Sequence, residues 1–299
     1  MKNVTIVIAA LLATAPLRAH AALEVLACEP EWAALATELG GELVSAESAT
    51  TPQQDPHYIQ ARPSLIAKVR RAALVVCTGA DLEVGWLPLL LRQAGNAAVQ
   101  PGQPGFLNAA DYVEMLDKPA SVDRSLGDVH PYGNPHIQTD PRNVGKIAAA
   151  LAERLASLDS ANAATYRARY EDFAARWQAA VARWSAAAEP LKGKQVVTHH
   201  KGWAYLESWL GLIEVGNLEP KPGLPASAAH LADLLDQIRG KQVAVIIRSV
   251  YEDGKASEWL AGRTSIPYVV LPHTVGSAPG ADDLFGVFDV IVKTLLEAK

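Results

Sequence analysis

The sequence is poor in cysteine and methionine and has no surplus of positive charge. Two of its 299 residues are cysteine and two are methionine, and Asp and Glu outnumber Lys and Arg by 32 to 27. The resulting net charge of −5 excludes general nucleic-acid binding, which requires a basic surface. Beyond the N-terminal segment, no apolar run reaches the roughly 18 residues of a membrane-spanning helix.

The common motifs of enzymes are also missing. The chain has no GxSxG nucleophile elbow, no P-loop, no GxGxxG after a strand and no HExxH helix. A zinc hydrolase would need a carboxylate base near its metal-bound water. Glu207 and Glu252 are candidates for that base, but no spacing singles them out. The sequence therefore favours a binding protein over an enzyme.

Residues 1–21, MKNVTIVIAALLATAPLRAHA, have the pattern of a secretory signal peptide. Lys2 precedes the apolar run Val4–Leu12, and the segment ends in the small-x-small cleavage pattern AHA. No cysteine follows the predicted cleavage point, so a lipid anchor is not expected. A buried N-terminal helix is the alternative interpretation. We expect an exported, periplasmic protein.

The two cysteines, Cys28 and Cys77, each lie at the end of an apolar, strand-like run. Neighbouring parallel strands would bring them together, and an oxidising compartment would then allow a disulfide. Two buried free thiols are the alternative, and the sequence does not decide between them. A metal site with two cysteines is disfavoured, because neither belongs to a CxxC motif.

Strand-like and helix-like segments alternate along the chain, which predicts parallel sheets covered by helices. The expected strands are 23–27, 42–45, 73–76, 195–198, 243–247 and 268–271. The expected helices are 29–39, 63–71, 81–92, 144–157, 161–188, 203–210, 227–238, 256–263 and 283–296.

One predicted helix stands out by its length. Residues 161–188 contain no glycine or proline and repeat aromatic side chains three or four residues apart. A helix of about 28 residues is about 42 Å long, enough to join two lobes. We therefore expect an α/β fold of two lobes, each a parallel sheet flanked by helices, joined by one long helix. The predicted parts are an N-terminal lobe at 22–143, a helical segment at 144–190 that includes the linker helix 161–188, and a C-terminal lobe at 191–299.

Four histidines fall in loops that follow strand-like runs or lead into helices: His57, His136, His200 and His273. In parallel α/β sheets, ligands bind at the carboxyl ends of the strands. Imidazole suits zinc, whereas Ca²⁺ and Mg²⁺ prefer oxygen. Histidines from separate loops can thus form one nitrogen-rich metal site, although a single loop histidine is more often solvated or a cap.

Two aspartates lie close to these histidines, each beside a proline: Asp55 and Asp140. Either carboxylate could accept the second ring N–H of a metal-bound histidine and fix its tautomer.

Three segments carry a resemblance to a known family. They read DPHYIQARPSLIAKVRRAALVVCTGADLEVGWLPLLL, NPHIQTDPRN and VVTHHKGWAYLESWLGL, with the long helix between the second and the third. In this order they resemble the zinc/manganese substrate-binding proteins of ABC importers (the cluster A-I, or cluster 9, family), over essentially the whole chain after the signal peptide. The resemblance implies a two-lobed periplasmic protein that captures a metal ion and hands it to a membrane permease.

The resemblance also implies the ligands. His57 and His136 match those of the N-terminal lobe, and His200, rather than His199, matches the third. The family usually has an acid after the last strand, where this chain has VVLPHTVGSAPG. We expect His273 or water at this fourth position and favour His273, which keeps the site tetrahedral. The missing acid favours zinc over manganese.

His130 lies in a short loop where many zinc-binding members have a long histidine-rich one. It is either an accessory residue that samples the ion or a solvated residue, and we favour the second. The implied partners are an ABC permease and, as a further candidate, a zinc metallochaperone; we expect a monomer. The rival functions are a manganese-binding homologue, a secreted zinc-dependent hydrolase, and an adhesin or organic-ligand binder on the same scaffold.

Overall fold

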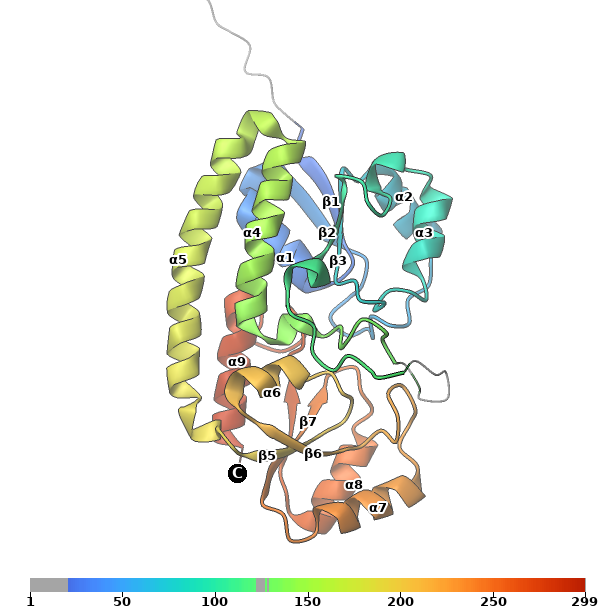
Figure 1. Ribbon diagram of the computed structural model, residues 1–299, viewed down its shortest axis with the longest axis vertical. Helices are drawn as coiled ribbons and strands as arrows, with labels where there is room; N and C mark the ends of the chain where they lie inside the picture. The colour runs from blue at the N-terminus through green and yellow to red at the C-terminus, as the bar shows by residue number, and fades with distance from the viewer. Residues whose placement is uncertain (1–20, 122–126, 128, 299) are drawn as a thin grey trace, which may run out of the picture.

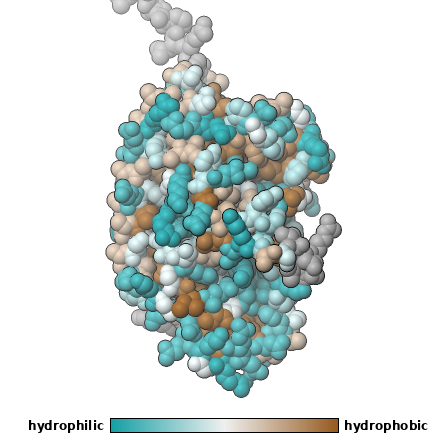
Figure 2. All heavy atoms as spheres, viewed as in Figure 1, coloured by the Kyte–Doolittle hydropathy of each residue, from teal (hydrophilic) through white to brown (hydrophobic). Residues whose placement is uncertain are grey.

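The computed structural model describes residues 21–121, 127 and 129–298. The predicted signal peptide at 1–21 lies outside these residues, apart from its last position. Two parallel four-stranded sheets form the framework, one from each half of the chain (Figure 1). Hydrophilic side chains predominate on the face shown in Figure 2, with hydrophobic ones in small scattered groups. None of the helices in the described ranges has the length and apolar character that a membrane span requires.

The first sheet has the strand order β2-β1-β3-β4. Successive residues of β1 and β3 alternate between two cores, one shared with α1 and α4 and the other with α2 and α3. This double burial explains the continuous apolar run of β3. The strands are β1 (Leu23–Ala27), β2 (Val44–Ser48), β3 (Leu74–Cys77) and β4 (Phe106–Asn108), and the helices are α1 (Pro30–Gly40), α2 (Pro63–Arg71) and α3 (Leu87–Ala94).

The second sheet repeats this arrangement with the order β6-β5-β7-β8. One face packs on α7 and α8, and the other joins the main core of the first half of the chain, so one hydrophobic core runs through both lobes. The strands are β5 (Gln195–Thr198), β6 (Ile213–Asn217), β7 (Val243–Ser249) and β8 (Tyr268–Leu271), and the helices are α6 (Ala204–Leu210), α7 (Ala228–Ile238), α8 (Lys255–Thr264) and α9 (Leu284–Glu297).

Helices α4 (Pro141–Leu158) and α5 (Ala163–Ala187) lie side by side along one flank (Figure 1). Near its start α5 is held to α1, since Arg169 donates two hydrogen bonds to the Glu38 carbonyl. Near its end it is held to α9, where Trp184 Nε1 donates to Asp289 Oδ1 at 2.6 Å. The ring of Trp177 packs edge-on against that of Phe288 in α9, with centroids 5.7 Å apart. One helix thus contacts both lobes, as predicted.

The structure corrects several predicted boundaries. The second strand begins at Val44 rather than Glu42, because Gly41–Leu43 form a 3₁₀ turn. The helix expected at 81–92 begins at Leu87, because the preceding turns contain left-handed residues at Ala80 and Asp81. The long helix is 25 residues, because a 3₁₀ turn occupies 160–162. Strands β4 and β6 were not predicted.

Candidate metal centre

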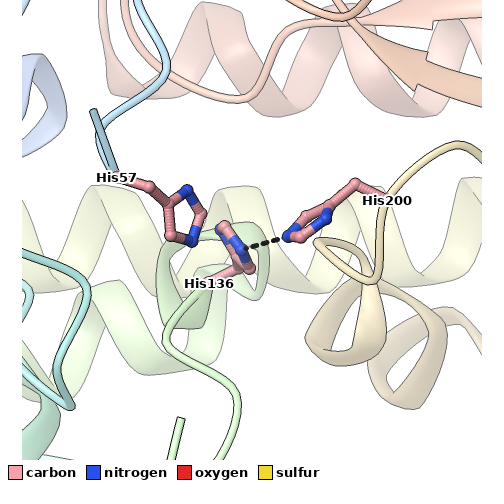
Figure 3. Close-up of side chains that lie close together, drawn as sticks. All are labelled: His57, His136 and His200. Atoms are coloured by element: carbon pink, nitrogen blue, oxygen red, sulfur yellow. Dashed lines mark hydrogen bonds between the residues drawn. The ribbon is translucent and has the colours of Figure 1, made fainter. Parts of the chain in front are cut away.

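Three histidines from distant parts of the chain converge where the lobes meet (Figure 3). His57 comes from the loop after β2, His136 from the loop before α4, and His200 from the loop after β5. One nitrogen of each ring lies within 4.8 Å of the other two. The Nε2 atoms of His136 and His200 are 3.2 Å apart. We call these residues the histidine trio.

The spacing of the rings suits a metal ion. Their centroids are 5.3 Å apart for His57 and His136, 5.2 Å for His136 and His200, and 5.6 Å for His57 and His200. Two imidazoles bound to one tetrahedral zinc at about 2.0–2.1 Å would place their centroids about 5 Å apart. Small side-chain shifts would therefore close the trio around one ion.

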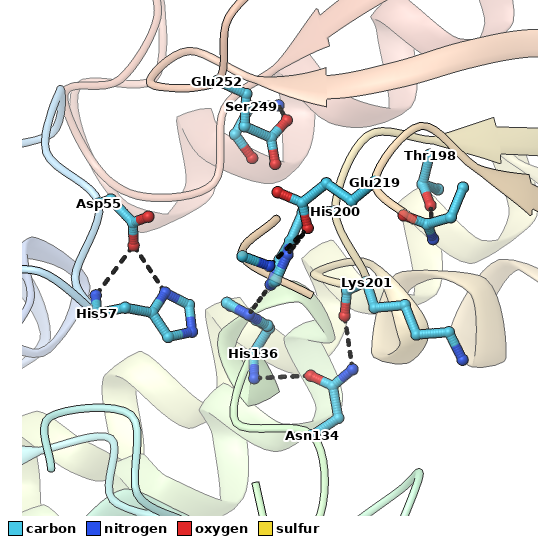
Figure 4. Close-up of polar contacts among 12 residues, drawn as sticks. Asp55, His57, Asn134, His136, Thr198, His200, Lys201, Glu219, Ser249 and Glu252 are labelled. Atoms are coloured by element: carbon cyan, nitrogen blue, oxygen red, sulfur yellow. Dashed lines mark hydrogen bonds and ion pairs between the residues drawn. The ribbon is translucent and has the colours of Figure 1, made fainter. Parts of the chain in front are cut away.

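Carboxylates orient two of the three rings (Figure 4). His57 Nδ1 lies 2.7 Å from Asp55 Oδ1, and His200 Nδ1 lies 2.8 Å from Glu219 Oε2. Each Nδ1 is therefore the protonated nitrogen, which leaves the Nε2 lone pair for a ligand. Consistent with this, His57 Nε2 is buried without a hydrogen-bond partner. Burial raises the pKa of Asp55, but the hydrogen bonds that Asp55 accepts from the side chain and backbone of His57 outweigh burial and lower that pKa overall.

His136 is held by a connection between the lobes. Its backbone N–H donates to Asn134 Oδ1 at 3.0 Å, and Asn134 Nδ2 donates to the Lys201 carbonyl at 2.7 Å (Figure 4). Burial, and then the neighbouring rings of His200 and His57, hold the pKa of His136 well below 6.5. A lowered pKa favours the neutral imidazole, which is the form that can bind a cation.

His273 and His130 lie near the trio but outside it. The ring of His273 packs edge-on against Tyr251, with centroids 4.7 Å apart, and its Nδ1 is buried without a hydrogen-bond partner. Burial lowers the pKa of His273 to about 4. The ring of His130 lies 5.3 Å from that of His57 and lines a cavity of about 460 Å³ together with His136 and His200.

Asp140 does not serve the site in the way the sequence suggested. Its Oδ1 accepts the backbone N–H of Arg142 at 2.8 Å, which caps the N-terminus of α4, and its Oδ2 pairs with the Arg142 side chain at 2.7 Å. The carboxylate that orients His200 is instead Glu219, which sequence analysis missed. Glu219 lies two residues after the end of β6, in a loop at the carboxyl end of that strand. Predicting β6 would therefore have made Glu219 a candidate by the rule that identified the histidines.

Glu207 and Glu252, the two candidate bases of a zinc hydrolase, line different cavities. Glu252 lines a cavity of about 300 Å³ with His57 and His200, and burial raises its pKa to about 7. Glu207 lines a different cavity, beside Lys201 and Glu214, whose lining includes no histidine. Only Glu252 is therefore placed near the trio.

Comparison with known proteins shows the family of this chain. The model of the family described as zinc-uptake complex component A, periplasmic (ZnuA), matches residues 25–298. The chain belongs to this family. ZnuA-family proteins are substrate-binding components of transport systems and not enzymes. The high-affinity zinc uptake system protein ZnuA of Yersinia pestis is 23% identical over 195 residues, and the match spans 61% of each chain, under two thirds of the relative's length.

Solved structures support the fold of this ZnuA-family chain. The crystal structure of a ZnuA superimposes with a TM-score of 0.77 at 22% identity, covering 92% of this chain and 98% of the other. A manganese-bound periplasmic metal binding protein of Candidatus Liberibacter asiaticus gives 0.73 at 17% identity, covering 91% and 98%. The two-lobed α/β architecture predicted from the sequence is confirmed.

Proposed function

We propose that this protein binds one zinc ion at the histidine trio in the periplasm and delivers it to the permease of an ABC importer. The observation that carries the proposal is the trio itself, with ring nitrogens within 4.8 Å of one another. In two of its three rings, Nδ1 is hydrogen-bonded to a carboxylate, which is the arrangement that presents Nε2 to a metal.

The donor atoms favour zinc over manganese. Three imidazoles form a nitrogen site, whereas Mn²⁺ prefers carboxylate and carbonyl oxygen. Asp55 and Glu219 contribute two negative charges just outside the rings, which balance a divalent ion held by neutral ligands. The Yersinia relative is named for zinc uptake and the Liberibacter structure holds manganese, so competition between the two ions is the test that separates them.

For the fourth ligand we retain His273, with water as the alternative. Its buried Nδ1 has no other partner, and a neutral donor suits a site whose charge Asp55 and Glu219 already balance. The ring would have to move towards the trio, because His273 is not within the 4.8 Å group. Binding of His273 would also exchange its contact with Tyr251 for a bond to the ion.

Isothermal titration of the metal-free protein tests the proposal. We expect one equivalent of zinc to bind with submicromolar affinity, and His57→Ala, His136→Ala or His200→Ala to weaken binding by orders of magnitude. His230→Ala is the matched control, since His230 does not belong to the trio and its Nε2 contacts the Asn217 carbonyl at 2.9 Å. Unchanged binding in the three trio variants would refute the assignment.

The remaining parts of the proposal have their own tests. Delivery to a permease predicts that zinc-dependent growth requires the trio in a strain that lacks its own zinc-binding component. Zinc transfer from a metallochaperone would appear as loading faster than from free chelated zinc, and a monomer would elute at the mass of one chain. A metal-independent adhesin would keep its ligand after complete zinc removal.

A further inference from the structure

Among the described residues, a second group of donor atoms lies within the same 4.8 Å limit as the histidine trio. It comprises Cys28, Cys77 and Glu83, with one ligand atom of each within 4.8 Å of the other two. All three side chains are buried, at 1%, 0% and 2% exposure. The two cysteines are joined by a disulfide in the structure. No part of the proposed zinc transport uses this group.

Strand pairing, rather than sequence spacing, brings the two sulfur atoms together. Ala27 of β1 lies opposite Val76 of β3, so Cys28 and Cys77 follow as the next pair, with Cα atoms 4.7 Å apart. This explains why a search for CxxC spacing gives no indication of a metal site here.

The turn after β3 brings Glu83 back to the cysteines. Glu83 Oε1 accepts the backbone N–H of Thr78 at 2.8 Å, and its Oε2 accepts that of Gly79 at 3.1 Å. These bonds fix the carboxylate at the carboxyl end of β3. A carboxylate oxygen has more than one lone pair, so Oε2 can still accept a cation.

A second buried carboxyl, Glu29, lies in the same place. Its Oε2 accepts from Thr78 Oγ1 at 3.0 Å, while its Oε1 is buried without a hydrogen-bond partner. Burial, and then the charge of Glu83, raise the pKa of Glu29 well above its usual range. Buried carboxylates in proteins are protonated, paired or bound to metal. Two buried carboxyl groups thus lie at the carboxyl end of β3, and that of Glu83 is within 4.8 Å of both sulfurs.

We propose that in the reduced chain the thiolates of Cys28 and Cys77, together with the Glu83 carboxylate, bind a zinc ion, and that closing the disulfide abolishes this site. A dithiol reduces the S–S bond to two thiols by thiol–disulfide exchange and itself becomes a cyclic disulfide. A phosphine supplies the two electrons, and one water molecule supplies both thiol protons and the oxygen of the phosphine oxide. Zinc then displaces both thiol protons. Tetrahedral zinc would hold sulfur at about 2.3 Å and the carboxylate oxygen at about 2.0–2.2 Å, so the sulfurs would separate to about 3.8 Å.

The cysteine site is separate from the proposed transport site but affects how zinc is shared within the chain. Thiolates are softer zinc ligands than imidazoles, so the reduced chain holds a site that competes with the trio. Oxidation converts both sulfurs into a disulfide, which does not bind zinc as a thiolate does. The redox state of Cys28 and Cys77 then decides whether the chain takes one ion or two.

Cobalt and zinc titrations of His136→Ala test the site without interference from an intact trio. The protein is refolded with a phosphine reductant and titrated anaerobically, in parallel with its oxidised form. We expect the reduced protein to bind one equivalent and to show the thiolate-to-cobalt charge-transfer band in the near ultraviolet. The oxidised protein should show neither. Loss of the band in Cys28→Ser/Cys77→Ser under the same reductant would complete the assignment.

A second measurement covers the case in which a variant folds poorly. Zinc bound to the thiolates should slow reoxidation of the otherwise unmodified chain, and Glu83→Gln should reduce this protection. Equal oxidation rates with and without zinc, or no thiolate band in reduced His136→Ala, would overturn the proposal. Neither result bears on the trio, because zinc binding by the trio is measured on the oxidised chain.

Discussion

Glu219→Gln tests how far zinc affinity depends on a side chain that does not touch the ion. Glu219 Oε2 accepts from His200 Nδ1 at 2.8 Å and from the Gly223 N–H at 2.9 Å, and the side chain is only 13% exposed. Glutamine keeps the size but removes the charge that fixes the ring's tautomer and strengthens its Nε2. Loss of such a partner lowers metal affinity about 10- to 100-fold, which is about 1.4 to 2.7 kcal/mol.

The assay is competition for zinc against a chromophoric chelator at fixed pH and ionic strength. Glu189→Gln is the control, because it makes the same change of charge at a side chain that is 73% exposed and remote from the trio. A general effect of net charge would appear in both variants. Affinity of Glu219→Gln within twofold of the parent, or an equal loss in both, would refute the argument that Glu219 acts through His200.

Four further changes have predicted outcomes. Asp55→Asn should weaken zinc binding about tenfold in the same chelator assay, because His57 Nδ1 loses its charged acceptor at 2.7 Å. Asn134→Ala should destabilise the protein by about 1–3 kcal/mol in urea unfolding, because the buried N–H of His136 loses its acceptor. In metal-free protein, burial lowers the pKa of His273 to about 4, against about 6.5 in the unfolded chain. The unfolded chain therefore binds this proton more readily, and stability is lost as the pH falls from about 6.5 to about 4. His273→Phe should remove about 2–3 kcal/mol of that loss when urea unfolding is compared at pH 7 and pH 4. Trp177→Ala should cost about 3–5 kcal/mol in the same measurement at pH 7, because the ring is buried between α5 and α9 and its Nε1 donates to the Pro141 carbonyl; a cost below 1 kcal/mol would contradict this packing.

The sequence predicted the central strands well because burial on both faces leaves a continuous apolar run. β3 reads LVVC and β5 reads QVVT, and such runs need little tertiary information to be recognised. The two missed strands, β4 and β6, lie at the edges of their sheets. β4 has only three residues, and every residue of β6 is at least partly exposed, so neither has a hydrophobic pattern.

The histidines were predictable because the carboxyl ends of parallel strands share one edge of the sheet. Of the carboxylates that bind their Nδ1 atoms, one was predicted and one was missed. Asp55 is two residues from His57, and a local bond is expected of it. Asp140 is also beside a proline and near a histidine, but an Asp-Pro pair is equally typical of a helix start. In the structure Asp140 is the N-cap of α4 and Pro141 lies in the first turn. Glu219 is 19 residues from His200, and only the pairing of β6 with β5 brings them together.

The attachment of α5 at both ends limits how the two lobes can move apart. Its first half is pinned to α1 by Arg169, and its second half to α9 by Trp184. Rotating one lobe away from the other would require α5 to bend or to lose its contacts with α1 or α9. It would also disrupt the hydrophobic core that both lobes share. A smaller movement, of the segments that carry His57 and His200, would separate the rings of the trio, since neither segment belongs to a helix or a strand. On the proposed function, a permease that removes the ion therefore needs to contact only those two segments, while the helices and sheets behind them stay in place.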